Sequence, residues 1–278
     1  MNIIQTIDFK VIDDVKCYAP ELAYENADYP TGHFDKLYSI ESSNFWFRSR
    51  NRIIQSLFSK YVDICIEREV LEIGCGTGYV LHGLSKFKNL KLTGAELHVE
   101  GLKFAKRRLP NVDFLQMDAR KMPFKEEEFD IVGAFDVLEH IEEDEVIMNN
   151  VYKILKQKGL LFITVPQHKW LWSTQDEASY HKRRYTRKEI VDKLSKANFN
   201  IIFASSFVFF LLPLMFLSRL IKRKSTDKEI LVYDYGELIF NPVLNRLFDY
   251  LMRFDEILIQ LGLEVLFGGS MIVVARKS

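Results

Sequence analysis

The sequence has only three cysteines and no excess of either charge, and both shortages exclude classes of protein. Cys17, Cys65 and Cys75 form no CxxC pair and their number is odd, so neither a disulfide framework nor a zinc site is expected, and a reducing cytoplasm fits best. The chain has 38 basic and 38 acidic residues and a formal net charge of zero. This balance argues against a surface that coats nucleic acid, and no nucleic-acid partner is expected.

Three further features are missing. The N-terminal stretch MNIIQTIDFKVIDD has no basic segment followed by an apolar one, so no signal peptide is expected. There is no internal repeat and no low-complexity tract. The six histidines are scattered along the chain, and no metal site is expected. The 278 residues, 48% of them hydrophobic, suit one large domain or one domain with an insertion.

Apolar segments alternate with helical patterns from residue 69 onward. The patterns predict strands at 69–73, 90–97, 112–118, 129–138, 160–166, 199–206 and 269–277, and helices at 79–87, 99–109 and 143–158. The strand cores VLEI, FDIVGAF and LLFITV are mostly apolar instead of alternating with polar residues, as a sheet covered on both faces requires. The expected fold class is therefore α/β, a doubly wound and mostly parallel sheet with helices on both faces.

The segment VLEIGCGTG at 70–78 ends the first strand in a glycine-rich loop. Gly74, Gly76 and Gly78 precede a helix, whose N-terminus offers free N–H groups to an anion. Glycine permits positive φ and lets a ligand lie against the backbone. The spacing differs from the dinucleotide-binding pattern because Tyr79 stands where its last glycine would be. The loop is either a ligand floor or only a tight connection.

Carboxylates recur at the ends of the next strands. Glu96 ends the second strand, Asp118 the third, and Asp136 follows the fourth. The carboxyl ends of parallel strands share one edge of a sheet, which is where ligands bind. Stability gives no reason to gather like charges there. A ligand with hydroxyls, an amine and a positive charge gives such a reason.

These motifs resemble those of the class I S-adenosylmethionine-dependent methyltransferases. VLEIGCGTG is similar to the first motif of that family, and GAEL, MDAR and FDVLEHI stand where its later motifs stand. The resemblance covers roughly residues 52–203 and the last strand. It implies a Rossmann-like sheet of seven strands with the last strand antiparallel. It also implies S-adenosyl-L-methionine as cofactor and S-adenosyl-L-homocysteine as product.

The resemblance further implies roles for single residues. Glu72 is expected to orient the amino end of the cofactor, Glu96 to bind both ribose hydroxyls, and Asp118 to meet the adenine amino group. Cys75 has the alternative of being only a small filler. The other implied contacts are Gly74, Cys75, Gly76 and Gly78 beneath the cofactor, Leu97 and Ala119 beside its adenine, and Phe135 and Asp136 along its methionine portion.

Methyl transfer from a sulfonium is an in-line displacement, so the protein mainly supplies position and a dry site. A hydroxyl or amine acceptor can also need a base. His140 follows Asp136 by four residues, and a helical turn there would let the carboxylate raise the basicity of the imidazole. His140 is therefore one candidate catalytic residue and His181 is another. The alternative for His140 is a structural histidine.

The segment SYHKRRYTRKEI at 179–190 is a basic loop that leads into a helix. Arginine forks suit phosphate or carboxylate groups. The segment also resembles an H-x-R-R-Y-[ST] stretch of a bacterial subset of the same family. Arg183, Arg184 and Tyr185 are therefore candidates for binding the acceptor, with Trp172 as a wall of the cleft. A solvated basic turn is the alternative.

The expected domain organisation has three parts. These are an N-terminal lid or cap at 1–51, a Rossmann-like domain at 52–206 and 268–278, and a helical, hydrophobic insertion at 207–267. In the resembling group a segment before the first strand covers the pocket, so Arg50 is expected to pair with the cofactor carboxylate and Trp46 to close the lid. Aromatic packing with exposed arginines is the alternative.

The insertion opens with an uncharged run that is too short to span a bilayer. About sixteen residues remain for a helix after the preceding strand, whereas ~20 are needed, and Pro213 interrupts them. The 207–224 segment is therefore expected to be a lid, a homodimer contact or a helix on a membrane surface. A second helix, with Leu244, Leu247 and Phe254 along one stripe, is expected to pack on the first.

These observations favour methyl transfer to a small-molecule, lipid-linked or glycan-linked acceptor, with O-, N- and C-methylation left open. The protein is expected in the cytoplasm, with contact to the inner face of the membrane left open. A nicotinamide-dependent oxidoreductase that uses the glycine loop is one alternative. A cofactor-binding scaffold without catalysis is another.

Overall fold

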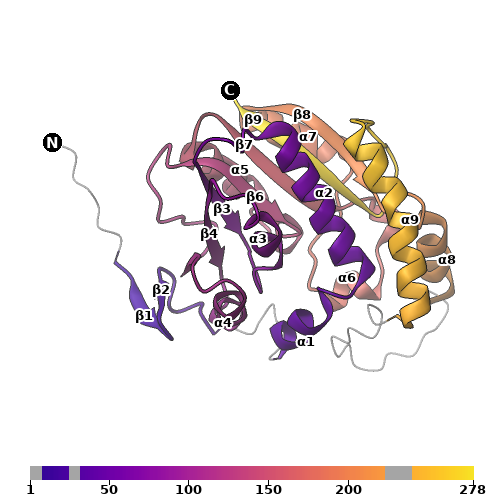
Figure 1. The fold of residues 1–278 in the computed structure, drawn as a ribbon, viewed down its shortest axis with the longest axis horizontal. Helices are drawn as coiled ribbons and strands as arrows, with labels where there is room; N and C mark the ends of the chain where they lie inside the picture. Colours follow the sequence, from indigo (N-terminus) through magenta and orange to yellow (C-terminus); the bar gives the residue numbers. More distant parts are fainter. Residues whose placement is uncertain (1–7, 25–31, 223–239) are drawn as a thin grey trace.

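A computed structural model of the chain describes residues 8–24, 32–222 and 240–278. The strands form one nine-stranded sheet in the order β1-β2-β5-β4-β3-β6-β7-β9-β8 (Figure 1). The strands are β1 Lys10–Ile12, β2 Val15–Cys17, β3 Arg68–Ile73, β4 Leu90–Glu96, β5 Asp113–Gln116, β6 Phe129–Phe135, β7 Leu155–Pro166, β8 Phe199–Phe207 and β9 Ser270–Lys277.

The predicted fold class is confirmed, and all seven predicted strands are present as β3 to β9. The pairs from β5 to β7 are parallel, and β9 runs antiparallel to both β7 and β8. The strand count differs because a hairpin, β1–β2, extends the sheet beside β5. Each of its strands has only three residues, which is too short for a period-2 pattern to reveal.

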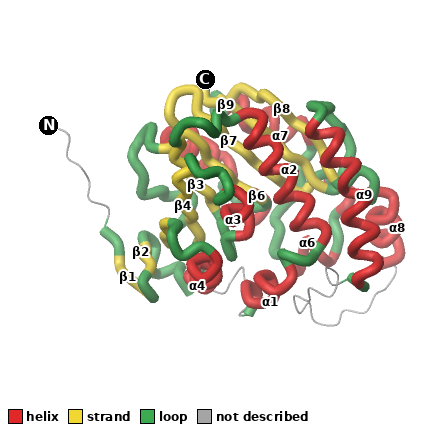
Figure 2. The backbone as a smooth tube through the Cα atoms, in the orientation of Figure 1, coloured by secondary structure: helices red, strands yellow, loops and turns green. Residues whose placement is uncertain are grey.

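Helices cover both faces of the sheet (Figure 2). The helices are α1 His33–Ile40, α2 Phe45–Tyr61, α3 Tyr79–Leu84, α4 Val99–Arg108, α5 Asp144–Ile154, α6 Thr174–Ala178, α7 Arg187–Lys196, α8 Leu212–Lys222 and α9 Pro242–Gln260. Leu57 of α2, Leu81 of α3 and Leu102 of α4 lie in one buried cluster, which α9 joins. Ile147 of α5 and Leu194 of α7 lie in the other. The sheet is therefore doubly wound.

The predicted helix at 143–158 is wrong at its C-terminal end. α5 ends at Ile154 and β7 begins at the next residue. Leu155 pairs with Phe129 of β6, and the Lys156 ammonium lies 2.7 Å from Asp130 Oδ2. Because residues from Leu155 onward pair with β6, the last predicted helical turn is a strand in the structure. Local periodicity does not reveal such long-range pairing.

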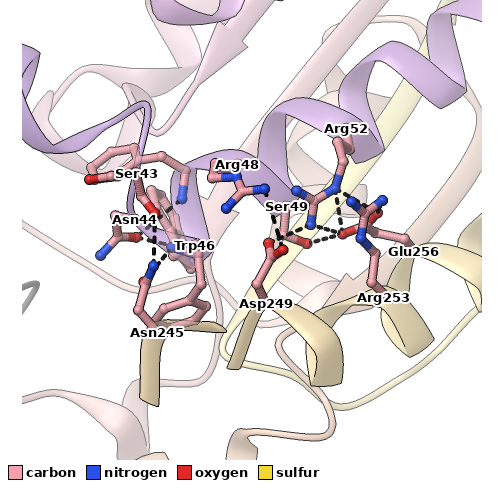
Figure 3. A network of polar contacts seen from close by, with 12 residues as sticks. Ser43, Asn44, Trp46, Arg48, Ser49, Arg52, Asn245, Asp249, Arg253 and Glu256 are labelled. Atoms are coloured by element: carbon pink, nitrogen blue, oxygen red, sulfur yellow. Dashed lines mark hydrogen bonds and ion pairs between the residues drawn. The ribbon is translucent and has the colours of Figure 1, made fainter. Parts of the chain in front are cut away.

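Polar side chains join α9 to α2, the long helix that crosses the front of the sheet (Figure 3). Arg52 Nη2 donates to Asp249 Oδ1 at 2.8 Å, and Arg52 Nε donates to Glu256 Oε2 at 2.8 Å. The Ser49 hydroxyl donates to Glu256 Oε1 at 2.8 Å. Asn245 Nδ2 donates to the Ser43 carbonyl at 2.8 Å. The polar side of α9 therefore faces inward.

Much of the apolar stripe of α9 consequently faces outward, although the Phe254 ring still packs against Phe210 in the segment before α8, with 5.5 Å between the ring centroids. Leu244, Leu247 and Phe254 are 46%, 50% and 53% exposed. We call the exposed apolar side chains of α8 and α9 the outer apolar face. Its members are Leu214, Phe216, Leu217, Val243, Leu244, Leu247, Tyr250, Phe254 and Ile257. Contiguous exposed apolar patches usually mark interaction surfaces.

Pro213 does not interrupt the first helix of the insertion. α8 begins at Leu212, so Pro213 lies in the first turn, where its missing N–H is not needed. None of the helices in the described ranges is both long and apolar enough to cross a membrane. Residues 223 and 224 of the predicted 207–224 segment lie outside the described residues. The predicted domain boundaries stay predictions, and α2 runs across the one at 51/52.

Candidate active site

A cavity of about 810 Å³ opens at the carboxyl ends of the central strands, within the ~300–1,000 Å³ range of small-molecule sites. Most of the predicted site residues line it. They are Trp46, Arg50, Glu72, Gly74, Cys75, Gly76, Glu96, Leu97, Asp118, Ala119, Phe135, Asp136, His140, His181 and Arg184. Four do not line it, namely Gly78, Trp172, Arg183 and Tyr185.

The three glycines of the loop after β3 all have positive φ, but they serve different needs. A Cβ at Gly74 would lie 2.4 Å from Val137 Cγ2, and one at Gly78 would lie 3.2 Å from Ala105 Cβ. Gly78 therefore packs against α4 and does not form part of the cavity floor. A Cβ at Gly76 would meet nothing closer than 3.9 Å. Gly76 is the position where a ligand can approach the backbone.

The Glu96 carboxylate at the end of β4 is fixed by backbone N–H groups. Its Oε2 accepts from Gly76 N at 3.0 Å, and its Oε1 accepts from Leu97 N at 2.7 Å and His98 N at 3.2 Å. Each carboxylate oxygen has two acceptor positions, so Oε2 retains capacity for a ligand hydroxyl. The carboxylate is therefore pre-oriented toward the cavity.

Glu72 is a buried carboxyl without a full set of partners. Its side chain is 3% exposed, and its Oε2 has no hydrogen-bond partner among the described residues. Burial raises the pKa of Glu72 to about 8. An unpartnered buried carboxylate is costly, and a cationic donor in the cavity would satisfy it.

Arg50 enters the cavity from α2 and forms an ion pair with Asp136. Thr164 Oγ1 also donates to Asp136 Oδ2, at 2.9 Å. The Arg50 guanidinium lies 4.7 Å from the centre of the Trp46 ring, which supports it from one side. Arg50 Nε is buried and has no partner among the described residues. A carboxylate in the cavity would therefore find one free guanidinium donor.

Asp118 is less available than the sequence suggested. Arg120 Nε donates to both of its carboxylate oxygens at 3.0 Å, and Arg120 N donates to Oδ1 at 2.8 Å. Ala119 and Leu97 line the cavity beside it. An adenine base bound beside Leu97 and Ala119 would therefore have to share the Asp118 carboxylate with Arg120.

The residues present fit S-adenosylmethionine. Glu72 suits its ammonium group, Arg50 Nε its carboxylate, Glu96 Oε2 its ribose, and Gly76 leaves room for close approach. Bound there, the cofactor would supply an activated methyl group on a sulfonium. Cys75 lies beneath, and burial raises the pKa of its thiol well above the ordinary value, so the thiol stays protonated.

His140 lies at the cavity wall, but its predicted activation by Asp136 is wrong. The turn Leu138–His140 is a 3₁₀ turn, not an α-helix, and Asp136 has φ +57°. Burial, with a smaller effect of His181, lowers the pKa of His140 well below its ordinary value. The two imidazole rings are 4.8 Å apart, edge to face. His140 is therefore a neutral imidazole at pH 7.

Three of the residues predicted to bind the acceptor have structural partners outside the cavity. The Tyr185 hydroxyl is buried and donates to Asp144 Oδ2 of α5 at 2.7 Å. Arg183 also pairs with Asp144, at 3.2 Å. Trp172 Nε1 donates to Glu177 Oε1 of α6 at 3.3 Å. The contacts of Tyr185 and Arg183 hold the loop before α7 to α5, and the contact of Trp172 ties the segment before α6 to that helix.

Sequence reasoning missed several residues of the cavity wall. Glu139 follows Asp136 by three residues, and the sequence places it among the acids at the strand ends without indicating a role for it. His33, Phe34 and Glu41 come from α1 and its C-terminus, and they had no comparable pattern. They reach the cavity only because α1 folds back across the carboxyl ends of the strands.

Comparisons with known proteins find similarity to methyltransferases. Residues 71–163 match the family model described as a methyltransferase domain. A Mycolicibacterium smegmatis protein named "Probable S-adenosylmethionine-dependent methyltransferase" is 23% identical over 58% of this chain and 62% of its own length. The demethylmenaquinone methyltransferase of Chlorobaculum tepidum is 30% identical over 49% of this chain and 55% of its own length. The chain thus spans only about three-fifths of these relatives.

The fold has counterparts among solved structures. Phosphoethanolamine N-methyltransferase 2 of Haemonchus contortus, in complex with S-adenosyl-L-methionine, matches with a TM-score of 0.54 and 19% identity. The match covers 82% of this chain and 52% of that one. At this identity the likeness concerns the fold. Together with the matched methyltransferase domain and the motifs at the strand ends, it makes the chain similar to the class I S-adenosylmethionine-dependent methyltransferases.

Proposed function

We propose that this protein transfers the methyl group of S-adenosyl-L-methionine to a small-molecule or lipid-linked acceptor. The observation that carries the proposal is Glu72, a buried carboxyl at the end of β3 with an unpartnered oxygen on the cavity. The ammonium group of the cofactor would be its partner. Glu96 would hold the ribose, and Arg50 Nε the carboxylate. Phe135 and Asp136 would line the methionine portion.

Positioning is the main contribution of the chain's own residues. Trp46 and α1 close one side of the cavity, and α8 closes another with Leu214 and Met215. These walls would exclude water from the acceptor atom, which favours in-line displacement. His140 and His181 face the same space and are the candidate bases for a hydroxyl or amine acceptor.

The acceptor end of the cavity supports an apolar or lipid-linked substrate. Leu214 and Met215 of α8 line the cavity, and Leu214 also belongs to the outer apolar face together with Phe216 and Leu217. α8 therefore connects the site with an apolar surface suited to a membrane. We infer a cytoplasmic protein that touches the inner face of the membrane there. The relative named for demethylmenaquinone supports a small-molecule acceptor.

Incubation with isotopically labelled methyl donor and fractionated extracts tests the proposal. Label is expected in the lipid fraction, because the outer apolar face adjoins the cavity. Label found only in the water-soluble fraction would support methyl transfer and contradict a lipid-linked acceptor. Cofactor binding without label in any fraction would favour the non-catalytic scaffold. Binding of NADH in place of the methyl donor would favour the oxidoreductase.

A further inference from the structure

Three potential metal ligands meet at the cavity wall. Glu139 and His140 belong to the 3₁₀ turn after β6, and His181 lies in the loop between α6 and α7. One ligand atom from each side chain lies within 4.8 Å of the other two. All three residues line the cavity.

The Glu139 carboxyl is the second observation that points to a cation. The side chain is 0% exposed, and neither of its carboxylate oxygens has a hydrogen-bond partner among the described residues. A buried carboxylate in this condition is costly unless a cation or donor compensates it. The nearby Arg50 is committed to Asp136.

His181 is held in an orientation that suits metal binding. Its Nδ1 lies 2.9 Å from Asp176 Oδ1, so the imidazole donates there and its Nε2 carries the free lone pair. Asp176 is fully buried and also accepts from Arg184 Nε at 2.7 Å. A carboxylate that orients a histidine in this way is the usual support of a metal-bound imidazole.

We propose that Glu139, His140 and His181 bind one divalent first-row transition ion, such as Zn²⁺ or Mn²⁺. One carboxylate and two imidazoles are the ligand set of many such sites, and three protein ligands leave a position open to the cavity. Ligand bonds of ~2.1 Å bring ligand atoms to about 3.4 Å from one another in a tetrahedral site. The ligand atoms must therefore approach one another by up to about 1.4 Å, the difference between 4.8 Å and about 3.4 Å. His181 is far from Glu139 and His140 in the sequence, so the spacing of the three residues gave no sign of the site.

The open position faces the cavity that would hold the cofactor and acceptor. An oxygen of the acceptor is the natural further ligand, since the ion would then orient it and lower the pKa of a hydroxyl there. This step rests on the proposed function. An ion at this position narrows the acceptor to compounds with a hydroxyl or similar oxygen that can bind it. That oxygen is either the methylated atom itself or a neighbour of the methylated atom.

Metal binding is tested without any catalytic assay. The full chain is stripped with a chelator and titrated with Co²⁺ followed by visible absorption, then with Zn²⁺ in competition. The wild type is expected to bind one ion with the spectrum of a nitrogen- and oxygen-ligated site. Glu139→Gln and His181→Gln are each expected to weaken binding at least 100-fold. Asp176→Asn, which alters only the support of His181, is expected to weaken it by about 10–100-fold.

The matched control is His82→Gln, which removes an exposed histidine on α3 and leaves binding unchanged. Far-UV circular dichroism checks that each variant is folded. Because His181 is partly exposed, His181→Gln still tests the proposal if Glu139→Gln does not fold. Absence of saturable Co²⁺ binding, or equal binding by wild type and both ligand variants, overturns the proposal. Calorimetry with S-adenosylhomocysteine on the same samples judges the proposed function separately.

Discussion

The cavity rim and helix α9 both bury glutamates, and Glu256 of α9 differs from the rim glutamates in its electrostatic setting. At the rim, Glu72 and Glu139 have carboxylate oxygens without partners. In α9, Glu256 is just as buried, yet Arg52, Ser49 and Arg253 all donate to it. A buried charge with a complete set of partners anchors one element to another. A buried charge that lacks partners at a cavity indicates a ligand.

The same two regions also differ in how they use apolar surface. The cavity rim turns its charges inward around a ligand-sized space. Helix α9 turns charged side chains toward α2 (Figure 3) and much of its apolar stripe toward solvent. Burial of charge at α9 is therefore linked to exposure of the outer apolar face. Four variants test this contrast, taken from the largest expected effect to the smallest.

Glu72→Gln is expected to remove a pH dependence of stability of up to about 4 kcal/mol. Burial raises the pKa of Glu72 to about 8, so the unliganded protein is most stable below the ordinary value near 4.5 and loses stability as the pH rises toward 8. Chemical denaturation at several pH values measures this. The glutamine variant should be more stable at pH 8 and should bind the cofactor more weakly. A wild-type free energy of unfolding that does not change between about pH 4.5 and pH 8 would contradict the raised pKa of Glu72.

Arg52→Ala is expected to destabilise the protein by about 3 kcal/mol, because it leaves Glu256 and Asp249 buried without their main partner. Denaturant unfolding measures the change. The control is Lys188→Ala, which removes an exposed pair with Asp192 and should cost no more than about 0.5 kcal/mol. If the two variants were equally stable, the α2–α9 network would not be the anchor described above.

Glu96→Ala is expected to weaken cofactor binding by roughly 1.5–3 kcal/mol per lost charged hydrogen bond. The carboxylate is the proposed ribose acceptor, and it also holds Gly76 N. Calorimetry measures the affinity, with Glu67→Ala on the exposed segment before β3 as control. Unchanged affinity would place the ribose elsewhere.

A double variant, Leu247→Glu with Phe254→Glu, is expected to leave the free energy of unfolding within about 0.5 kcal/mol, because both side chains are half-exposed. Binding to anionic lipid vesicles should weaken by about 1 kcal/mol for each lost apolar contact. Val146→Glu, on α5 across the sheet, is the control. If the wild type, the double variant and Val146→Glu bound vesicles equally, the outer apolar face would not be a membrane contact, and a second copy of the chain would be its expected partner.

Sequence patterns predicted the strands of the sheet and the residues of the cavity rim far better than the orientation of the helices in the insertion at 207–267. VLEIGCGTG and the acids at the strand ends act through local geometry, since a residue that ends a parallel strand must lie at the carboxyl edge. The orientation of α9 depends on partners about two hundred residues away, such as Arg52 and Glu256. Its hydrophobic stripe was visible in the sequence, but periodicity alone does not say whether the stripe faces in or out.

The same limit explains the misplaced residues of the site. Arg50 was expected to meet the cofactor carboxylate, and the structure adds an ion pair between its Nη1 and Asp136 that the sequence did not indicate, with Nε left unpartnered. Tyr185 and Arg183 looked like acceptor ligands because of their neighbours in the chain, whereas Asp144 on α5 binds both. Residue type predicted that these side chains need partners, and only the fold determines which partners they find.

The most direct test of the central claim, that the cavity rim binds S-adenosylmethionine, is a calorimetric titration of the full chain. S-adenosylmethionine, S-adenosylhomocysteine and NADH are titrated in turn. The expected result is saturable binding of one molecule of either adenosyl compound per chain, with no heat from NADH. Binding of NADH with no response to either adenosyl compound would contradict the account.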